Sequence, residues 1–274
     1  MSGTVGGATG VERIAEAFES ARASGRRAAL MPYMMGGFPD LETSRRIGLA
    51  YADAGADLIE LGVPFSDPLA DGPVIHAAGT TALRAGIRVH DVLEVGRAVA
   101  ARVPVVVMCY ANLILARGLD RFADALLDAG ASGLIVPDLP FEESPEALRV
   151  CDERGLALVP LVAPTTPEQR LARIGAQARG FVYTVSLTGT TGERSGVADG
   201  LAGVVARAAA CTAVPVAVGF GISTPDQAAA AAAAGADGVI VGSRLVRAAG
   251  EAEDPVAAVG ALVRELSSGL ATRH

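Results

Sequence analysis

The chain of 274 residues contains no lysine, and all 23 of its cationic side chains are arginine. Without a lysine amine the chain cannot form a Schiff base, so it can neither hold pyridoxal phosphate covalently nor act as a lysine-type aldolase. The same absence excludes a Walker-type phosphate loop, which needs its lysine. Any carbon–carbon bond chemistry on this chain therefore requires a different electron sink.

Cysteine and histidine are also scarce. The three cysteines, Cys109, Cys151 and Cys211, lie far apart and form no CxxC pair. This pattern is typical of reduced thiols and not of a disulfide framework or a zinc site. The three histidines show no ligand spacing, so we expect no metal centre. Reduced thiols, together with small polar residues 1–10 that lack a signal-peptide pattern, favour a cytoplasmic protein.

Positive charge and long apolar runs are limited too. The formal net charge of −7 argues against a nucleic-acid backbone or an anionic membrane surface as the partner. The longest apolar stretch, Pro104–Ala116, carries Asn112 and is too short to span a bilayer. Hydrophobic residues nevertheless make up 51% of the chain against 19% charged residues, so a large buried core is available.

Short apolar runs alternate with longer amphipathic segments along the whole chain. Most runs are rich in valine, isoleucine and leucine, as strands buried on both faces should be. The eight runs are Ala29–Gly36, Asp57–Gly62, Pro104–Tyr110, Gly133–Asp138, Ala157–Ala163, Gly180–Ser186, Pro215–Gly221 and Asp237–Ser243. With no linker or break in composition, they predict one α/β domain over residues 1–274, a (β/α)8 TIM barrel. The alternative, a doubly wound open sheet, usually has fewer strands, and no GxGxxG follows the first run.

Helix signals fill the segments between the runs. Val11–Gly25 predicts an extra helix ahead of the first strand, and residues 1–10 are interpreted as a flexible extension. Thr224–Gly235 begins with a capping threonine and a proline, which are typical of a helix start. Further helices are predicted over Leu41–Gly55, Leu119–Gly130 and Asp254–Leu270. The longer gaps follow Gly62 and Ser186, and extra length after a barrel strand is where the fold keeps its site.

Two carboxylates are candidates for acid–base chemistry. Glu60 lies inside an apolar run, where it either reaches solvent, pairs with an arginine, or is buried with the raised pKa that a general acid needs. Asp71 lies in the following loop, where Asp-Gly-Pro also suits a simple turn, and the same holds for Asp67 in Ser-Asp-Pro. If the buried carboxyl of Glu60 and the loop carboxyl of Asp71 lie at the same barrel mouth, they would form an acid–base pair.

Glycine-rich segments follow the last three runs: Gly189–Gly192, Gly219–Ser223 and Val241–Arg244. Bare backbone N–H groups followed by helix N-termini suit a phosphate dianion, and barrels often bind phosphate at this place. The alternative is that these glycines only make tight turns. Arg244 either assists a phosphate electrostatically or, as we favour, is a surface helix residue.

The segment Glu60–Gly72, with its run Pro-Phe-Ser-Asp-Pro-Leu-Ala-Asp-Gly, resembles the signature of the tryptophan synthase alpha chain family. The resemblance covers nearly the whole chain. It includes Pro32-Tyr33, Gly36–Asp40, Tyr110-Ala-Asn112, Val136–Pro140, Tyr183, Gly189–Gly192, Gly219–Ser223 and Gly242-Ser243. Departures are mild, since Tyr33 stands where the family often has phenylalanine and Thr190 where valine is common.

The resemblance implies a lyase of L-tryptophan biosynthesis that cleaves indole-3-glycerol phosphate into indole and glyceraldehyde 3-phosphate by a retro-aldol reaction. It implies that Glu60 protonates indole C3 and relays the hydroxyl proton, that Asp71 holds the indole N–H, and that Tyr183 lines the site. The protonated indole is then the electron sink, in agreement with the missing lysine. The implied substrate contacts are Tyr33, Met108, Tyr110 and Ile135 around the indole, Thr191, and Gly192, Phe220, Gly221, Gly242 and Ser243 at the phosphate.

The resemblance also implies a partner and a lid. The family works in an alpha2beta2 assembly with a beta chain that carries pyridoxal phosphate, and Pro64, Asp67 and Asn112 match the partner-facing surface. This chain itself needs no cofactor. The segment Gly189–Gly200 resembles the mobile lid of the family. The alternatives are a stand-alone lyase that releases indole, another sugar-phosphate barrel such as an isomerase, and a non-catalytic ligand-sensing subunit that activates a partner.

Overall fold

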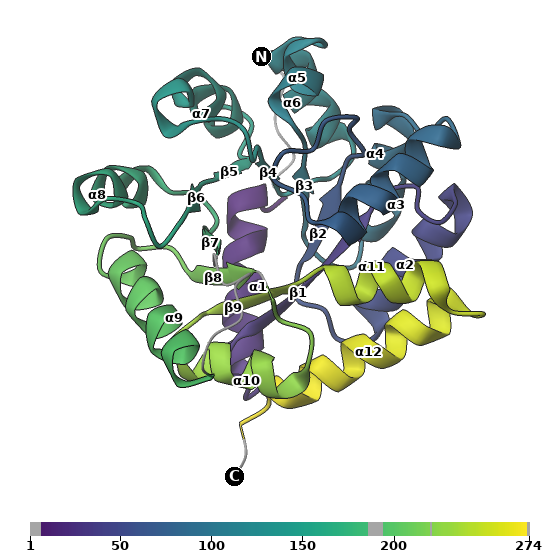
Figure 1. Ribbon diagram of the computed structural model, residues 1–274. Coiled ribbons are helices and arrows are strands. Elements are labelled where there is room, and N and C mark those ends of the chain that lie inside the picture. The colour runs from purple at the N-terminus through teal and green to yellow at the C-terminus, as the bar shows by residue number, and fades with distance from the viewer. Residues whose placement is uncertain (1–6, 186–193, 220, 273–274) are drawn as a thin grey trace.

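The computed structural model describes residues 7–185, 194–219 and 221–272, with the backbone alone for 194–199, and parallel strands form one curved sheet in it (Figure 1). Its strands are β1 (Ala29–Met35), β2 (Ile59–Gly62), β3 (Val105–Met108), β4 (Gly133–Ile135), β5 (Ala157–Val159), β6 (Leu161–Val162), β7 (Val182–Val185), β8 (Val216–Gly219) and β9 (Gly238–Val241). They are hydrogen-bonded in the order β5-β4-β3-β2-β1-β9-β8-β7-β6.

The two ends of this sheet meet at Pro160. The predicted run Ala157–Ala163 is a strand in two pieces, in which β5 pairs with β4 and β6 pairs with β7. Proline has no N–H and interrupts a strand, but the Pro160 carbonyl accepts a hydrogen bond from Tyr183 N at 2.9 Å. The predicted eight-stranded barrel is thereby confirmed, with its fifth strand divided by a proline.

Helices surround the sheet (Figure 1). They are α1 (Gly10–Ala23), α2 (Leu41–Asp53), α3 (Pro73–Arg84), α4 (Val89–Ala100), α5 (Ala111–Leu115), α6 (Leu119–Asp128), the 3₁₀ turn η1 (Phe141–Glu143), α7 (Pro145–Asp152), α8 (Glu168–Gln177), α9 (Arg194–Ala209), α10 (Pro225–Ala233), α11 (Ser243–Glu251) and α12 (Pro255–Leu270). The long gap after Gly62 is filled by α3, which precedes the outer-layer helix α4. The last helix, α12, packs against α2 and α10 and closes the ring of helices.

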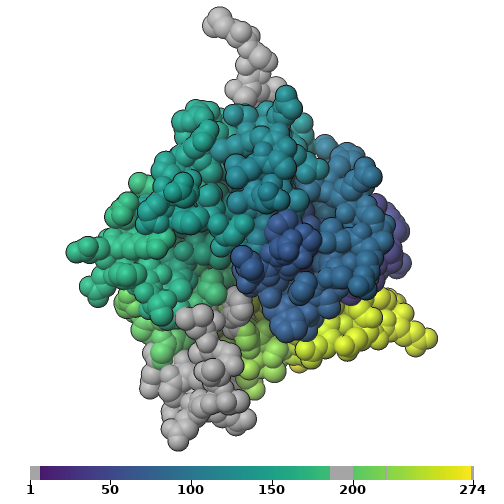
Figure 2. Space-filling model, turned by 45° about the horizontal axis from the view of Figure 1, so that its top comes forward, coloured from purple at the N-terminus to yellow at the C-terminus, as the bar shows by residue number. Residues whose placement is uncertain are grey.

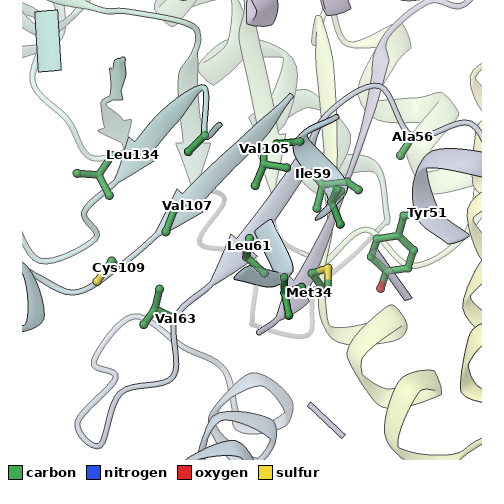
Figure 3. Close-up of a cluster of buried hydrophobic side chains, with 14 of the residues drawn as sticks. Met34, Tyr51, Ala56, Ile59, Leu61, Val63, Val105, Val107, Cys109 and Leu134 are labelled. Carbon is green, nitrogen blue, oxygen red and sulfur yellow. The ribbon is translucent and has the colours of Figure 1, made fainter. Parts of the chain in front are cut away.

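Strand side chains alternate between the barrel interior and the helix layer, as the two-residue period of a strand requires. Figure 3 shows part of the helix-facing set, in which Ile59 and Leu61 of β2 lie with Val105 and Val107 of β3 and with Leu134 of β4. The alternate residues of the same strands face inward. This register directs Glu60 of β2 into the barrel, between two outward-facing neighbours.

The extra helix α1 closes one end of the barrel interior. Its buried residues Ile14, Phe18 and Ala21 belong to the same apolar cluster as the inward-facing side chains of the strands, such as Val106 and Ala217. Thr9 caps this helix, and its side chain accepts a hydrogen bond from Glu12 N at 3.2 Å. The helix predicted at Val11–Gly25 is therefore confirmed, and it starts one residue earlier, at Gly10. Of the predicted flexible extension 1–10, residues 1–6 lie outside the described part.

Two helix-to-strand turns repeat the sequence Ala-Gly-Ala-Asp, at residues 54–57 and 234–237. The glycines adopt φ values of +101° at Gly55 and +97° at Gly235, a region that a side chain disfavours. The aspartate that follows each turn binds the backbone of a neighbouring strand segment, since Asp57 accepts from Leu30 N at 2.8 Å and Asp237 from Val216 N at 2.9 Å. The turns therefore fix where the barrel strands begin. No helix in the described ranges is long and apolar enough to cross a membrane.

The Asp57 carboxylate generates a prediction about stability. Its side chain is 8% exposed and pairs with Arg26, whose Nη1 lies 2.7 Å from Asp57 Oδ2. Replacing Asp57 by Ala leaves a largely buried arginine without its carboxylate, so we expect a loss of about 3 kcal/mol in the free energy of unfolding. Urea unfolding followed by circular dichroism measures it.

The matched control is Asp53→Ala, which breaks an exposed pair with Arg102 of 3.2 Å. Exposed pairs contribute about 0–1 kcal/mol, so this change should cost little. Equal losses in the two variants would contradict the role assigned to Asp57.

Candidate active site

A cavity of about 990 Å³ opens at the carboxyl ends of the barrel strands. Of the residues expected at the site, eight line it: Tyr33, Glu60, Asp71, Met108, Tyr183, Gly221, Gly242 and Ser243. They come from β1, β2 and its following loop, β3, β7, and the segments after β8 and β9. The fold thus brings together residues that are up to 210 positions apart, Tyr33 and Ser243.

Glu60 is buried at the wall of this cavity. It is 2% exposed, and its Oε2 atom has no hydrogen-bond partner in the described part of the chain. Burial, and secondarily the negative charge of Asp71, raises the pKa of Glu60 to about 8. Of the possibilities open from the sequence, the structure selects the buried carboxyl with a raised pKa. At neutral pH this group carries a proton that it can donate.

Asp71 lies in the loop after β2, partly buried, and is held by Tyr110. The Tyr110 hydroxyl donates to Asp71 Oδ1 at 3.1 Å and accepts from Ala70 N at 3.0 Å, while the Phe65 ring stacks on the Tyr110 ring at 5.1 Å. Burial raises the pKa of Asp71, and the Tyr110 hydrogen bond and then His76 act against the increase. Glu60 and Asp71 are therefore two carboxyls in different environments, as acid–base work requires.

Two tyrosines, Tyr33 on β1 and Tyr183 on β7, face the same cavity. Each tyrosine hydroxyl occupies the space that a side chain at the end of the neighbouring strand would need. A Cβ atom at Gly62 would clash with the Tyr33 hydroxyl, and a Cβ at Gly219 would clash with that of Tyr183. Burial first, and then the carboxyls of Glu60 and Asp71, raise the pKa of both tyrosines. Both phenols therefore remain protonated donors.

The glycine-rich segments after β8 and β9 lie at helix starts. Gly221 has a φ of +73°, and Gly242 caps α11, which begins at Ser243. Arg244 lines the cavity, against the favoured interpretation as a surface residue. Its guanidinium donates to the Ser223 carbonyl, and its Nη2 lies 3.2 Å from Glu265 Oε2.

Several expected site residues are not among the described residues that line the cavity. Thr191, Gly192 and Phe220 fall outside the described residues, as does much of the expected lid segment Gly189–Gly200. Ile135 is fully buried in the barrel interior and does not line the cavity. Among the positions expected to face a partner, Asp67 and Asn112 are exposed, whereas Pro64 is buried.

Sequence reasoning missed two features of this site. It placed Tyr110 among the apolar contacts of the indole, whereas its hydroxyl holds Asp71. It also missed Arg247, which lines the cavity one helical turn after Ser243. The spacing of four residues along α11 was the available signal for Arg247. Among the residues described, no cluster of three or more His, Cys, Asp or Glu side chains is placed to hold a metal ion.

A (β/α)8 barrel with two carboxyls of raised pKa at the carboxyl ends of its strands has the design of an acid–base barrel enzyme. The profile described as tryptophan synthase alpha chain matches residues 18–270. The chain therefore belongs to the tryptophan synthase alpha chain family, a family of lyases.

Curated relatives and solved structures agree with this assignment. The tryptophan synthase alpha chain of Synechococcus elongatus is 49% identical over 94% of this chain and 96% of its own length. That of Methanosarcina mazei is 45% identical over 94% of each chain. A Mycobacterium tuberculosis tryptophan synthase structure matches with a TM-score of 0.87 and 41% identity, covering 97% of this chain and 100% of that one.

The raised pKa of Glu60 generates a prediction about pH. Folded Glu60 keeps its proton up to about pH 8, whereas an unfolded glutamate loses it near its ordinary pKa of 4.5. The contribution of Glu60 to stability is therefore present below pH 4.5 and is lost as the pH rises through 8. The Glu60→Gln variant has no such pH-dependent loss of stability. The difference between its melting temperature and that of wild type should therefore increase from about pH 5 to about pH 9. We expect an increase of at least ~2 °C, measured by calorimetry.

The matched control is Glu94→Gln on α4, an exposed carboxylate whose pair with Arg97 is 3.2 Å long. Its difference from wild type should not grow over this pH range. A constant difference for Glu60→Gln would contradict the buried, protonated state of Glu60.

Proposed function

We propose that the chain cleaves indole-3-glycerol phosphate to indole and glyceraldehyde 3-phosphate, as the alpha subunit of tryptophan synthase. The observation that carries this proposal is the buried, protonated Glu60 that lines the same cavity as Asp71, in a member of this family. The carboxyl pair also separates this reaction from other sugar-phosphate barrels, whose glycine-rich loops do not require it.

Glu60 acts as both acid and base in this proposal. Its proton goes to indole C3, which leaves a cationic ring with an N1=C2 double bond. The resulting carboxylate takes the proton of the hydroxyl on the carbon attached to C3. The bond between that carbon and C3 then breaks, its electron pair neutralises the ring, and the carbon becomes the aldehyde. All protons and electrons of the reaction are accounted for without a cofactor, because the protonated indole accepts the electron pair of the broken bond.

Asp71 stabilises the positive charge in this proposal. An ionised carboxylate beside the indole N–H favours the cationic ring, and charge stabilisation of this kind often contributes more to catalysis than any other effect. The Tyr110 hydrogen bond supports this role, since it favours the ionised form of Asp71 against the effect of burial. Burial thus holds Glu60 in its acid form, whereas the Tyr110 hydrogen bond partly offsets the rise in the pKa of Asp71. Tyr183 forms the wall beside them.

The phosphate is proposed to bind at Gly221, Gly242 and Ser243, together with Gly192, Thr191 and Phe220. The start of α11 offers unpaired N–H groups and the positive end of its dipole, which favour an anion. Arg247 at the cavity wall adds positive charge to the same side. Tyr33 and Met108 are proposed to contact the indole.

We propose the tryptophan synthase beta chain as the partner, in an alpha2beta2 assembly. Leu69, which is 91% exposed, and Leu115, which is 70% exposed, are apolar side chains with no cover from the described part of this chain. Tyr110 ties the loop of Leu69 to the start of α5, which ends at Leu115. Asp67 and Asn112 are exposed on the same two segments, and Figure 2 shows the loop after β2, in dark blue, on the surface at the centre of the view.

Pyridoxal phosphate is proposed to belong to that beta chain, which would condense the indole with serine. A chain without lysine cannot bind this cofactor covalently. We also propose a cytoplasmic location, supported by three free cysteines, of which Cys109 and Cys151 are buried.

The turnover of indole-3-glycerol phosphate tests the function. Glyceraldehyde 3-phosphate formed by the purified chain is measured alone and with the beta chain of the same organism. A rate of about 1–10³ s⁻¹ only in the presence of the beta chain supports the proposed alpha subunit. Such a rate for the chain alone supports the stand-alone lyase instead.

Glu60→Gln is the variant for the same assay. It keeps the shape of Glu60 but has no proton to exchange, so turnover should fall at least about 10²-fold while the substrate still binds. If the wild-type chain binds the substrate but turns it over neither alone nor with the beta chain, the result would support the ligand-sensing subunit. Unchanged turnover in Glu60→Gln would contradict the role of Glu60.

The exposed leucine of the loop after β2 tests the partner. Leu69→Glu places a charge on the proposed interface, so its affinity for the beta chain should fall roughly tenfold or more, as measured by calorimetry. The matched control is Leu127→Glu at the end of α6, where Leu127 is 50% exposed. Equal affinities for Leu69→Glu and wild type would contradict the proposed surface.

A further inference from the structure

The hydroxyl of Tyr33 is buried and unpaired in the described part of the chain. The residue is 3% exposed, and its hydroxyl oxygen has no hydrogen-bond partner among the residues described. Buried polar groups are nearly always paired, because leaving one unpaired costs the hydration that it had in water. A buried hydroxyl without a protein partner at a cavity wall is therefore available to a ligand.

Four buried side-chain atoms lack a partner in the described residues: Tyr33 Oη, Glu60 Oε2, Ser132 Oγ and Thr184 Oγ1. Only the first two belong to residues that line the cavity. Tyr33 and Glu60 are also direct neighbours, since they pair across β1 and β2 in the register of the sheet. Among the described residues, the two buried unpaired atoms that belong to the cavity wall are thus a hydroxyl and a carboxyl oxygen on adjacent strands.

The surroundings of Tyr33 determine where its hydroxyl lies. The ring packs in an apolar cluster with Met35, Ala78 and Val246. The hydroxyl lies against the backbone of Gly62, two residues beyond Glu60 on the same inward face of β2, where any larger residue would clash with it. The site therefore reserves space for this oxygen at the end of the strand that carries the acid–base group.

We propose that the Tyr33 hydroxyl contacts the substrate and donates a hydrogen bond to the side-chain hydroxyl oxygen from which Glu60 takes the proton. This inference rests on the proposed function. One substrate oxygen then satisfies both unpaired atoms, since it accepts from Tyr33 and donates its proton to Glu60. The oxygen is held by the two adjacent strands β1 and β2.

The chemical contribution of Tyr33 is to stabilise negative charge on that oxygen. As the O–H proton passes to Glu60, the oxygen becomes more negative before the carbon–carbon bond breaks and the aldehyde C=O forms. A donor placed at this oxygen strengthens as the charge develops and so lowers the barrier. The phenol keeps its own proton throughout, because burial and the neighbouring carboxyls raise its pKa.

Tyr33→Phe tests the inference, because it removes only the hydroxyl and keeps the ring in its cluster. Turnover is measured with the beta chain present. We expect kcat to fall roughly tenfold or more, the effect of losing a hydrogen bond to a charged group, with KM changed less than about threefold. The affinity for indole-3-propanol phosphate, which lacks both side-chain hydroxyls, should stay within about twofold of wild type.

Thr184→Val is the matched control. Thr184 also has a buried hydroxyl without a partner in the described chain, but the residue does not line the cavity. Its removal should leave kcat unchanged. Melting temperatures of both variants establish that they fold.

The outcomes separate the inference from the proposed function. Unchanged kcat in Tyr33→Phe, with active wild type, overturns the inference alone. An equal loss of affinity for indole-3-propanol phosphate also overturns it, since the hydroxyl would then act on the shape of the site. An equal loss of kcat in Thr184→Val overturns it too. A wild-type chain that is inactive with the beta chain overturns both the function and the inference.

Discussion

The burial of one carboxyl group inside a barrel is the constraint on which the rest of this site depends. Glu60 faces inward because β2 alternates it with Ile59 and Leu61, which pack against the helix layer. Desolvation makes its charged form costly, so the group holds its proton near neutral pH. The neighbouring strand ends then have to leave space at the mouth for the substrate and for the two tyrosines that flank it.

That space is provided by glycine at strand ends. Gly62 and Gly219 each leave space for a tyrosine hydroxyl, that of Tyr33 and that of Tyr183, at the end of the neighbouring strand. Asp71 is positioned differently, by a loop that Tyr110 holds through two hydrogen bonds and a stacked ring. Glu60 comes from a barrel strand and Asp71 from a tethered loop, which is the usual division between barrel scaffold and loops.

Much of this arrangement could be predicted from the sequence. The apolar runs indicated the strands, because burial on both faces leaves an almost continuous apolar pattern. The same pattern placed Glu60 inside an apolar run, but it left open whether the carboxyl is buried, reaches solvent or pairs with an arginine. The hydrogen bond between Tyr110 and Asp71 could not be predicted, since it joins the loop after β2 to the start of α5 and depends on their positions in space. Neither the burial of Pro64 nor the depth of Ile135 could be inferred, because a position along the chain does not give height along the barrel axis.

The arginines at the mouth have a consequence for the reactivity of the product. Glyceraldehyde 3-phosphate is an aldehyde, and aldehydes condense with amines to form Schiff bases. The cationic side chains of the cavity wall, Arg244 and Arg247, carry guanidinium groups, whose delocalised charge leaves no free electron pair for such a condensation. A lysine in either place would expose an amine to every aldehyde molecule that leaves. With arginine in both places, the cavity wall carries positive charge without an amine that could condense with the carbonyl.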